Sequence, residues 1–397
     1  MTSSRVVGYV RAFVTLLVVA HHAMLAYHPF APPPASFLAE PRSWLVFPIS
    51  DSAKSMTASL LVGANDLFFM ALMFFLSGLF VWHSLQRKGA AGFLRDRARR
   101  LGLPFIASFL ILAPIAYYPS YLVTTSTPTF SEFITAWLSL DLWPAGPGWF
   151  LWVLLAFDAL AAAIFALAPA TGAYLSRLTD GARLRPMRFV ALVVALSLLA
   201  YLPLALTVGP MHWTTWGPFA VQTGRALHYL LYFLLGIGVG VYGLDQGLLA
   251  LDGRLARRWW AWLAGAVMTY AVALVAIVVS FSPDRPALPW DLLNGICFVL
   301  SCAMSSMAVL AVFLRFARPS AILDSLRDNA YGMYLVHYAI VTWVQYVLLP
   351  APWPGLVKAV VAFGSTVALS WFVTAMARRM ALPRSTGRTP IGDVTRA

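Results

Sequence analysis

The sequence predicts an all-α, polytopic membrane protein of about ten transmembrane helices, with both termini in the cytoplasm. Two features of the composition support this fold class. Of the 397 residues, 60% are hydrophobic and only 11% are charged, and the mean hydropathy is +0.77. Soluble globular chains average about 45–50% apolar and about 25% charged residues. The composition therefore excludes a soluble enzyme, a disordered protein and a disulfide-rich secreted scaffold.

The apolar stretches define the expected helices. A helix needs about 20 mostly apolar residues to cross the hydrocarbon core of a bilayer. Ten stretches meet this requirement: 8–27, 59–83, 102–123, 149–169, 187–207, 226–243, 260–281, 292–314, 331–349 and 356–377. We interpret the first as a retained helix and not a cleaved signal peptide, because His21 and His22 interrupt it and a Pro-rich segment follows. The spans make one transmembrane domain over residues 1–380, and residues 381–397 form a cytoplasmic tail that we expect to be disordered.

The basic residues give the expected orientation. With the N-terminus inside, the cytoplasmic segments hold 22 of the 28 Lys and Arg residues and the outside loops hold five, while Arg11 lies in the first span. Such an excess on one side is typical of cytoplasmic loops. It also accounts for the net charge of +13 without any nucleic-acid partner.

Two of the outside connections are long, 28–58 and 124–148. Tryptophans gather at the second connection and at the span that follows it: Trp137, Trp143, Trp149 and Trp152. This cluster favours an aromatic belt at the membrane interface, with a sugar-stacking platform as the less favoured alternative.

We expect no metal site. The only cysteines, Cys297 and Cys302, lie five apart in one apolar run. This spacing suits neither a metal site nor a disulfide, so the cysteines indicate nothing about the redox compartment.

Ionisable side chains inside the spans are candidate functional residues, because burying a charge in lipid is unfavourable. Arg11 and His22 in the first span are eleven residues apart, which is nearly three helical turns. They therefore share one helix face, about 16 Å apart along the axis, whereas His21 points about 100° away. For His21, His228 and His337, an ordinary hydrogen bond between helices is the favoured role. The arginine on the same face makes His22 the candidate catalytic residue.

A carboxylate close to His22 would orient its ring and favour the basic tautomer. Asp66 in the second span lies about 10 Å below the outer surface, close to the depth of His22. Asp158 in the fourth span is slightly deeper and is the alternative partner. Asp66 could equally pair with a neighbouring helix, and the sequence does not decide between these roles.

The segment FLRDRARRLGLPF contains a second candidate site, at the start of the third span. Arg97 and Arg100 are three residues apart, so they can present two guanidinium groups to one anion. Beside a helix N-terminus they would form a cytoplasmic phosphate site. On spacing alone, the favoured role is that of topology anchors, since cytoplasmic loops commonly carry arginine.

Taken together, these segments resemble the acyltransferase-3 family of integral membrane O-acyltransferases. The family's pattern of Arg, ten residues and His is met in VRAFVTLLVVAHH, by Arg11 and His22. Its Phe-Phe…Ser-Gly-Phe segment is similar to FFMALMFFLSGLFVW, and its Arg-x-x-Arg motif is similar to RARR, with Arg97 and Arg100. Later landmarks of the family resemble GPGWFLWVLL, YFLLGIGVG and YGMYLVHY, so the resemblance spans nearly the whole transmembrane region.

The chain departs from the family pattern in one motif. Members often carry an Asp three residues before the motif arginine, where this chain has Gly8, so the contribution of that Asp must be supplied otherwise or is missing. The periplasmic hydrolase-like domain that is fused to some relatives is also not found. We therefore expect a stand-alone transmembrane module.

The resemblance implies a function for these residues. The family moves acyl groups, commonly acetyl and sometimes succinyl, from cytoplasmic acyl-coenzyme A to a hydroxyl of a carbohydrate, lipid-linked or other cell-envelope acceptor. In our hypothesis Arg97 and Arg100 hold the phosphates of the donor, most often acetyl-coenzyme A, and the pantetheine arm passes Arg11. His22, assisted by Asp66, then takes the proton from the acceptor hydroxyl. A covalent acyl-histidine intermediate fits the sequence equally well.

Two other classes of function also fit parts of the sequence. A transporter or flippase for a glycan or a small anionic solute would also have ten spans with intramembrane charges. We find no paired repeat halves, however, and the arginines cluster on one side. A non-catalytic assembly subunit would not need Arg11 and His22 on one helix face. The family's typical setting implies a multi-pass protein of a bacterial inner membrane.

Overall fold

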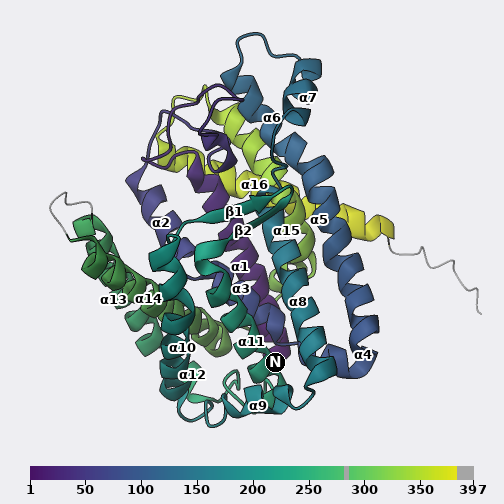
Figure 1. Cartoon of the computed structure of the whole chain (residues 1–397), viewed down its shortest axis with the longest axis vertical. Coiled ribbons are helices and arrows are strands. Elements are labelled where there is room, and N and C mark those ends of the chain that lie inside the picture. The colour runs from purple at the N-terminus through teal and green to yellow at the C-terminus, as the bar shows by residue number, and fades with distance from the viewer. Residues whose placement is uncertain (281–285, 382–397) are drawn as a thin grey trace, which may run out of the picture.

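The computed structural model describes residues 1–280 and 286–381. These residues form a helical bundle with one short hairpin (Figure 1). The helices are α1 (Ser3–Leu25), α2 (Met56–Asp66), α3 (Phe69–Gly78), α4 (Val81–Arg97), α5 (Leu103–Ala107), α6 (Ala113–Thr124), α7 (Phe130–Leu138), α8 (Trp149–Leu167), α9 (Thr171–Arg177), α10 (Pro186–Thr207), α11 (Ala226–Tyr242), α12 (Arg254–Arg257), α13 (Trp259–Ser280), α14 (Ala287–Phe316), α15 (Ala321–Leu348) and α16 (Gly355–Ala381). The antiparallel strands are β1 (Trp213–Trp216) and β2 (Phe219–Gln222), with Trp213 opposite Gln222. The tail predicted to be disordered, apart from its first residue, lies outside the described residues.

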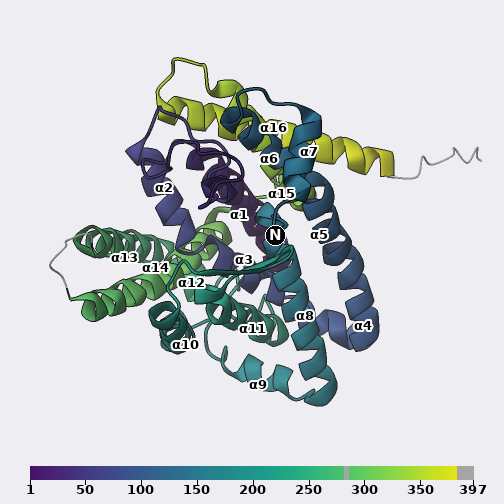
Figure 2. The same ribbon diagram turned by 45° about the horizontal axis from the view of Figure 1, so that its top comes forward.

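The fold is that of an all-α, polytopic membrane protein. Nine helical segments of the described chain are long and apolar enough to cross a membrane, and they correspond to nine of the ten predicted spans. The predicted span 331–349 falls in α15, where polar residues such as His337 and Gln345 lower the hydropathy. α15 packs against α1, α6 and α16, so its polar groups face protein. α13 and α14 pack side by side and project from the bundle (Figure 2).

Proline breaks the third predicted span into shorter helices joined by wide π-helical turns. Pro104 has no N–H to donate to the carbonyl of Arg100, four residues earlier. The hydroxyl of Tyr331, on α15, donates to this carbonyl instead. Trp343 Nε1, also on α15, donates at 3.0 Å to the carbonyl that Pro119 leaves free. The prolines therefore leave two carbonyl acceptors that hold α15 against residues 98–124, which we call the kinked helix.

Glycine allows α3 and α11 to approach each other closely. A Cβ on Gly236 would lie 2.2 Å from the carbonyl oxygen of Phe75, and one on Gly240 would lie 1.9 Å from that of Leu79. No side chain fits at such distances. The YFLLGIGVG segment is thus a small-residue helix interface of the kind that packs membrane helices in the absence of a hydrophobic driving force.

The arginine-rich segments meet at one end of the bundle, where Figure 1 shows the N-terminus, α9 and α12. The N–H of Ser3 donates to Asp245 at 3.1 Å, and Arg5 is paired with Asp324. We call this end the arginine-rich end; it is formed by residues 1–5, 87–100, 177–188, 244–258 and 315–328. These are segments that the sequence assigns to the cytoplasmic side.

The long predicted outside connections lie at the opposite end, near α7 in Figure 1. A buried ion pair between Lys358 Nζ and Asp51 Oδ2, 2.7 Å apart, joins the first of them to the start of α16. Trp152 Nε1 donates at 2.8 Å to the carbonyl of Ala220 and so anchors the hairpin to α8. The hairpin was not predicted, because its two strands are only four residues long.

Candidate active site

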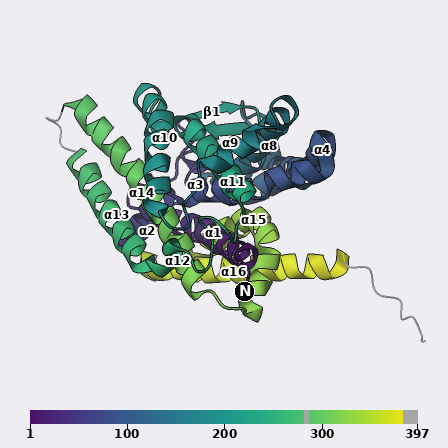
Figure 3. The ribbon, with the colours of Figure 1, turned by 90° about the horizontal axis from the view of Figure 1, so that it is seen from below.

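Arg11 and His22 lie on α1, at the centre of the bundle. Seen from below, α1 is surrounded by α3, α14, α15 and α16 (Figure 3). Their spacing of eleven residues puts the two side chains on the same face of α1, about 16 Å apart along its axis. Arg11 is the nearer of the two to the arginine-rich end, and His22 is nearer the opposite end.

Arg11 ties α1 to the break between α3 and α4. Its Nη2 donates to the carbonyl of Leu76 at 3.3 Å, and its guanidinium carbon lies 5.7 Å from the centre of the Phe80 ring. The Leu76 carbonyl is in the last turn of α3, where carbonyls lack a donor within the helix and attract a cation. Among the described residues, Arg11 has no carboxylate within ion-pair distance.

Gly8, where relatives often carry an Asp, faces α15. A Cβ on Gly8 would lie only 2.7 Å from Cδ of Arg327. Arg327 is in turn paired with Asp324 and Asp328, each at 2.9 Å. The acidic groups near position 8 are therefore Asp324 and Asp328 of α15. Arg327, also on α15, occupies the space that a longer side chain at position 8 would need.

The partner of His22 is a second histidine, His337 of α15. Nε2 of His337 lies 3.2 Å from Nδ1 of His22, and the ring centroids are 5.1 Å apart. Nδ1 of His22 also lies 2.9 Å from the carbonyl of Val18. Nδ1 of His337 lies 2.6 Å from the carbonyl of Tyr334. Each histidine is thus held by a carbonyl of its own helix.

These contacts determine which nitrogen carries hydrogen on each ring. A carbonyl only accepts, so Nδ1 of His337 is the N–H and its Nε2 has the lone pair. Nδ1 of His22 then carries the hydrogen that is shared between the Val18 carbonyl and His337 Nε2. Nε2 of His22 consequently keeps its lone pair and can accept a proton. This arrangement gives His22 the tautomer that a general base requires.

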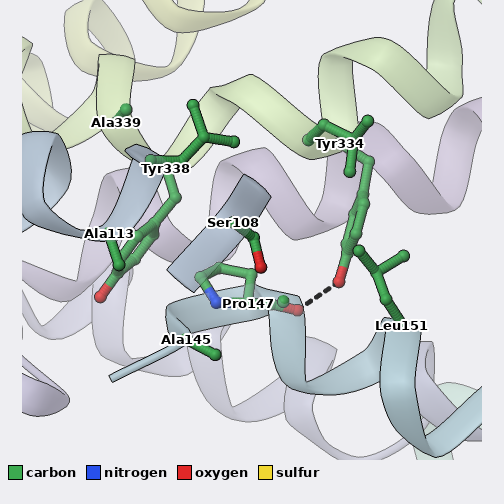
Figure 4. A pocket seen from close by; sticks show the side chains of 11 residues that line it. Ser108, Ala113, Ala145, Pro147, Leu151, Tyr334, Tyr338 and Ala339 are labelled. Atoms are coloured by element: carbon green, nitrogen blue, oxygen red, sulfur yellow. Dashed lines mark hydrogen bonds between the residues drawn. The ribbon is translucent and has the colours of Figure 1, made fainter. Parts of the chain in front are cut away.

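A small cavity lies beside the histidine pair. Its wall includes Tyr334 and Tyr338 of α15, Ser108 of the kinked helix and Pro147 of the Gly-Pro-Gly turn (Figure 4). Its volume is about 20 Å³, which is room for about one water molecule. The Tyr338 ring meets the ring of His22 edge-on at 5.0 Å, and the Tyr334 hydroxyl donates to the Pro147 carbonyl. The GPGWF and YGMYLVHY segments therefore meet next to His22.

Neither candidate carboxylate is a polar partner of His22 in the described chain, in contrast to the expectation from depth. Asp66 is paired with Arg225: Nη2 of Arg225 lies 2.7 Å from Oδ2, and its Nη1 donates at 3.0 Å to the Asp66 backbone carbonyl. The physical reason is the strength of a two-point arginine contact. His21 stacks on Phe69 and meets the ring of His22 edge-on, with the centroids 5.4 Å apart.

Asp158 faces Arg97 and is fully buried. Nε of Arg97 lies 3.1 Å from Oδ2 of Asp158, yet the N–H does not point along this line, and both Asp158 oxygens lack a hydrogen-bond donor among the described residues. Arg97 is also close enough to Arg11 for the two charges to repel each other. The interior near the arginine-rich end therefore holds two cations and one incompletely paired carboxylate.

Arg100 points away from Arg97, in contrast to the expected double fork. Its side chain is 70% exposed, and its Nε lies 2.9 Å from Oδ1 of Asp96. The two arginines are separated because residues 98–102 form a π-helical turn, in which the positions three apart no longer stack as they do in an α-helix. In the structure the two guanidinium groups face different carboxylates.

His337 contacts His22, whereas its sequence position taken singly predicts an ordinary interhelical role. Its place in YGMYLVHY is the sequence signal for a site residue. His228, in contrast, is buried beside Cys302, with Nε2 3.4 Å from Sγ. Both cysteines are free and buried, and the described residues hold no group of three or more His, Cys, Asp or Glu that could bind a metal ion.

Comparison with protein families supports the resemblance seen in the sequence. The acyltransferase domain model of the acyltransferase-3 family matches residues 7–375 of the 397. The match includes the histidine pair, Asp66, Asp158 and the cavity. Searches of curated proteins and of solved structures gave no match. Because the family model covers nearly the whole chain, the protein belongs to the acyltransferase-3 family and is a membrane-embedded O-acyltransferase.

Proposed function

We propose that the protein transfers an acyl group, acetyl in the first instance, from acyl-coenzyme A to a hydroxyl of a carbohydrate, lipid-linked or other cell-envelope acceptor. The observation that carries this proposal is the pairing of His22 with His337. It leaves Nε2 of His22 as a proton acceptor on a helix that also carries Arg11. Membership of the family supports acyl transfer as the reaction class, and the tautomer of His22 supports its role as the general base.

The proposed step uses His22 as the general base. Nε2 of His22 takes the proton of the acceptor hydroxyl as its oxygen attacks the thioester carbonyl. The new C–O bond forms, the C–S bond breaks, and the leaving thiolate receives the proton from His22. General-base catalysis of this kind contributes about 10²–10⁴-fold to a rate. Attack by His22 itself, through an acyl-histidine, would use the same nitrogen.

The donor binds, in this proposal, from the arginine-rich end. Arg97 is only partly compensated by Asp158, and Arg11 has no carboxylate partner in the described chain, so both can attract phosphate. Arg100 is exposed at the same end and can exchange Asp96 for a phosphate. The pantetheine arm would then span the roughly 16 Å between Arg11 and His22.

We further propose that the arginine-rich end faces the cytoplasm of a bacterial cell and that the bilayer is the inner membrane. The excess of arginine at this end supports the orientation. The donor would then enter from the compartment that contains acyl-coenzyme A, and the acceptor would reach His22 from the outer side.

The test compares two neighbouring histidines. The protein is purified in detergent and incubated with labelled acetyl-coenzyme A and a mixture of cell-wall sugars. We expect His22→Ala to lower acyl transfer by at least about 10²-fold. His21→Ala should retain activity, because its ring stacks on Phe69, away from His337. Transfer by the His22→Ala protein at the wild-type rate would remove His22 from the mechanism.

His337 can be tested as a positioning residue. His337→Phe removes one of the two acceptors for the hydrogen on Nδ1 of His22 and leaves only the Val18 carbonyl, whereas the side-chain oxygen of His337→Gln can still accept it. We therefore expect the glutamine variant to recover activity that the phenylalanine variant loses, with the KM for the donor unchanged in both. Equal loss in the two variants would mean that the hydrogen bond does not orient His22.

A further inference from the structure

A second cavity lies at the arginine-rich end, between the start of α10 and the α12–α13 segment. The N–H of Arg254, at the start of α12, donates at 3.0 Å to the carbonyl of Arg183, just before α10, and both segments lie toward the lower end of Figure 1. The cavity has a volume of about 310 Å³, which is large enough for a phosphate group with its substituents. We call it the four-arginine pocket, after four of the residues that line it: Arg185, Arg188, Arg254 and Arg258.

The positive charge of this pocket is not compensated. None of its four guanidinium groups has a carboxylate within ion-pair distance in the described chain, whereas Arg183, just outside it, is paired with Asp252. α10 begins at Pro186 with no acidic residue in its first turn, so the helix N-terminus adds further positive potential. The four arginines are exposed, so water and salt reduce their mutual repulsion, and an anion bound between them would reduce it further.

Trp262 provides an independent indication of a ligand. It lines the pocket and is only 4% exposed, yet its Nε1 is buried without an acceptor among the described residues. Buried N–H groups are paired in the great majority of cases, and an unpaired one is unfavourable. Nε1 has almost no accessible surface in this structure, so a ligand oxygen provides the missing acceptor once the side chains around the pocket shift to uncover this N–H.

We propose that the four-arginine pocket binds the phosphate group of an anionic ligand, with Trp262 Nε1 donating to it. The pocket is separate from Arg97 and His22, and the proposal does not depend on the function proposed above. Two sources of phosphate fit this chemistry: the headgroup of an anionic phospholipid and a soluble phosphate compound. Leu184 and Met187 at the pocket are exposed and apolar, as is Val267 along α13. Basic pockets of this kind at helix ends are suited to anionic lipid headgroups.

The experiment measures binding to the full chain in detergent micelles. Native mass spectrometry counts bound phosphatidylglycerol, with phosphatidylcholine as the neutral-headgroup comparison, and thermal shift measures stabilisation by inorganic pyrophosphate. The test variant is Arg188→Gln with Arg254→Gln. The matched control is Arg177→Gln with Arg257→Gln, which removes the same charge from exposed positions that do not line the pocket.

We expect the test variant to bind the phosphate probe at least about tenfold more weakly than the control, because it loses two charge-assisted contacts. Trp262→Phe, which keeps an aromatic ring and removes the N–H, should weaken binding about tenfold. A loss that is confined to phosphatidylglycerol identifies a lipid site, and one confined to pyrophosphate identifies a soluble ligand. Equal binding of every probe by the test and control variants would overturn the proposal, as would an unchanged affinity in Trp262→Phe.

Discussion

The interior of the bundle holds two carboxylate–arginine pairs that differ in how well they are satisfied. Arg225 contacts both the carboxylate and the backbone carbonyl of Asp66, at 2.7 and 3.0 Å, and lies 4.6 Å from the centre of the Phe298 ring. Asp158 lies 3.1 Å from Arg97, but neither of its oxygens accepts a hydrogen bond from a described residue.

This difference separates a structural pair from one that can take part in binding. The Asp66–Arg225 pair holds the end of α2 against the start of α11 through two hydrogen bonds from the guanidinium group. Asp158 restrains Arg97 by charge alone. An anionic donor can therefore compete for Arg97 without breaking a well-formed hydrogen bond. The comparison predicts that variants of the first pair change stability and that variants of the second change donor affinity.

The largest expected effect comes from Asp66→Ala. The variant leaves the guanidinium of Arg225, which is 5% exposed, without its charged partner. Breaking a buried pair in this way costs about 3–5 kcal/mol. Thermal unfolding of the purified protein in detergent should show a large loss of stability, and the protein that remains folded should keep its KM for the donor.

A double replacement tests the interpretation of that loss. Asp66→Leu combined with Arg225→Met removes both charges, and such apolar replacements are often neutral. Most of the stability should return. If the single variant unfolds within about 1 kcal/mol of the wild type, where exposed ion pairs fall, the Asp66–Arg225 pair is not structural.

The second effect concerns donor binding at Arg97. Arg97→Gln removes a guanidinium that faces the interior, and we expect the KM for acetyl-coenzyme A to rise about tenfold through loss of a charge-assisted contact. Arg99→Gln, an exposed neighbour in the same helical turn, provides the control and should change KM less than about twofold. Steady-state kinetics of thioester loss give both values. A similar KM in the two variants would show that positive charge at the arginine-rich end orients the protein in the membrane and does not bind the donor.

Asp158→Asn should change donor affinity in the opposite direction. The carboxylate is fully buried beside Arg97, so its neutralisation raises the positive potential that an anionic donor meets. One charge at this range is worth about 1 kcal/mol, or about a fivefold lower KM. Stability should change little, because no hydrogen bond is lost. A higher KM, or a loss of stability comparable to that of Asp66→Ala, would mean that Asp158 has a structural role like that of Asp66.

The two pairs also show what the sequence could and could not predict. The helical period places Arg11 and His22 on one face, and hydrophobicity places the spans, because both depend on local sequence. The partner of Asp66 depends on how a distant segment folds back: Arg225 was assigned to an outside loop, yet it reaches the end of α2. Depth in the membrane makes Asp66 a candidate partner of His22 and leaves a neighbouring helix as the alternative, since depth carries no information about which helices are neighbours.

The same limit applies to His337 and to the kinked helix. His337 reaches His22 only because α1 and α15, more than 300 residues apart in sequence, pack together in the fold. The third span is predicted as one uninterrupted helix, yet its prolines kink it, and the side chains that take over the free carbonyls come from α15. Local sequence therefore indicates which residues are unusual, and tertiary packing determines their partners.

The smallest expected effect concerns Asp245, an exposed carboxylate at the arginine-rich end. Asp245 accepts the backbone N–H of Ser3 at 3.1 Å, at the start of α1, which has no acidic residue in its own first turn. The Ser3 hydroxyl and then its N–H lower the pKa of Asp245 below the ordinary value of 3.8. Because the pKa is lower in the folded state, the contact stabilises the helix start above about pH 4 and is lost as the pH falls through the lowered pKa.

We expect Asp245→Asn to increase amide exchange of residues 3–6 only about twofold at pH 7, the size of one charge at an exposed helix end. At a pH below the lowered pKa, the wild type and the variant should exchange alike once the intrinsic rate is corrected. Hydrogen-exchange mass spectrometry of the purified protein measures both, and a difference that persists at low pH would mean that the charge of Asp245 does not hold the start of α1.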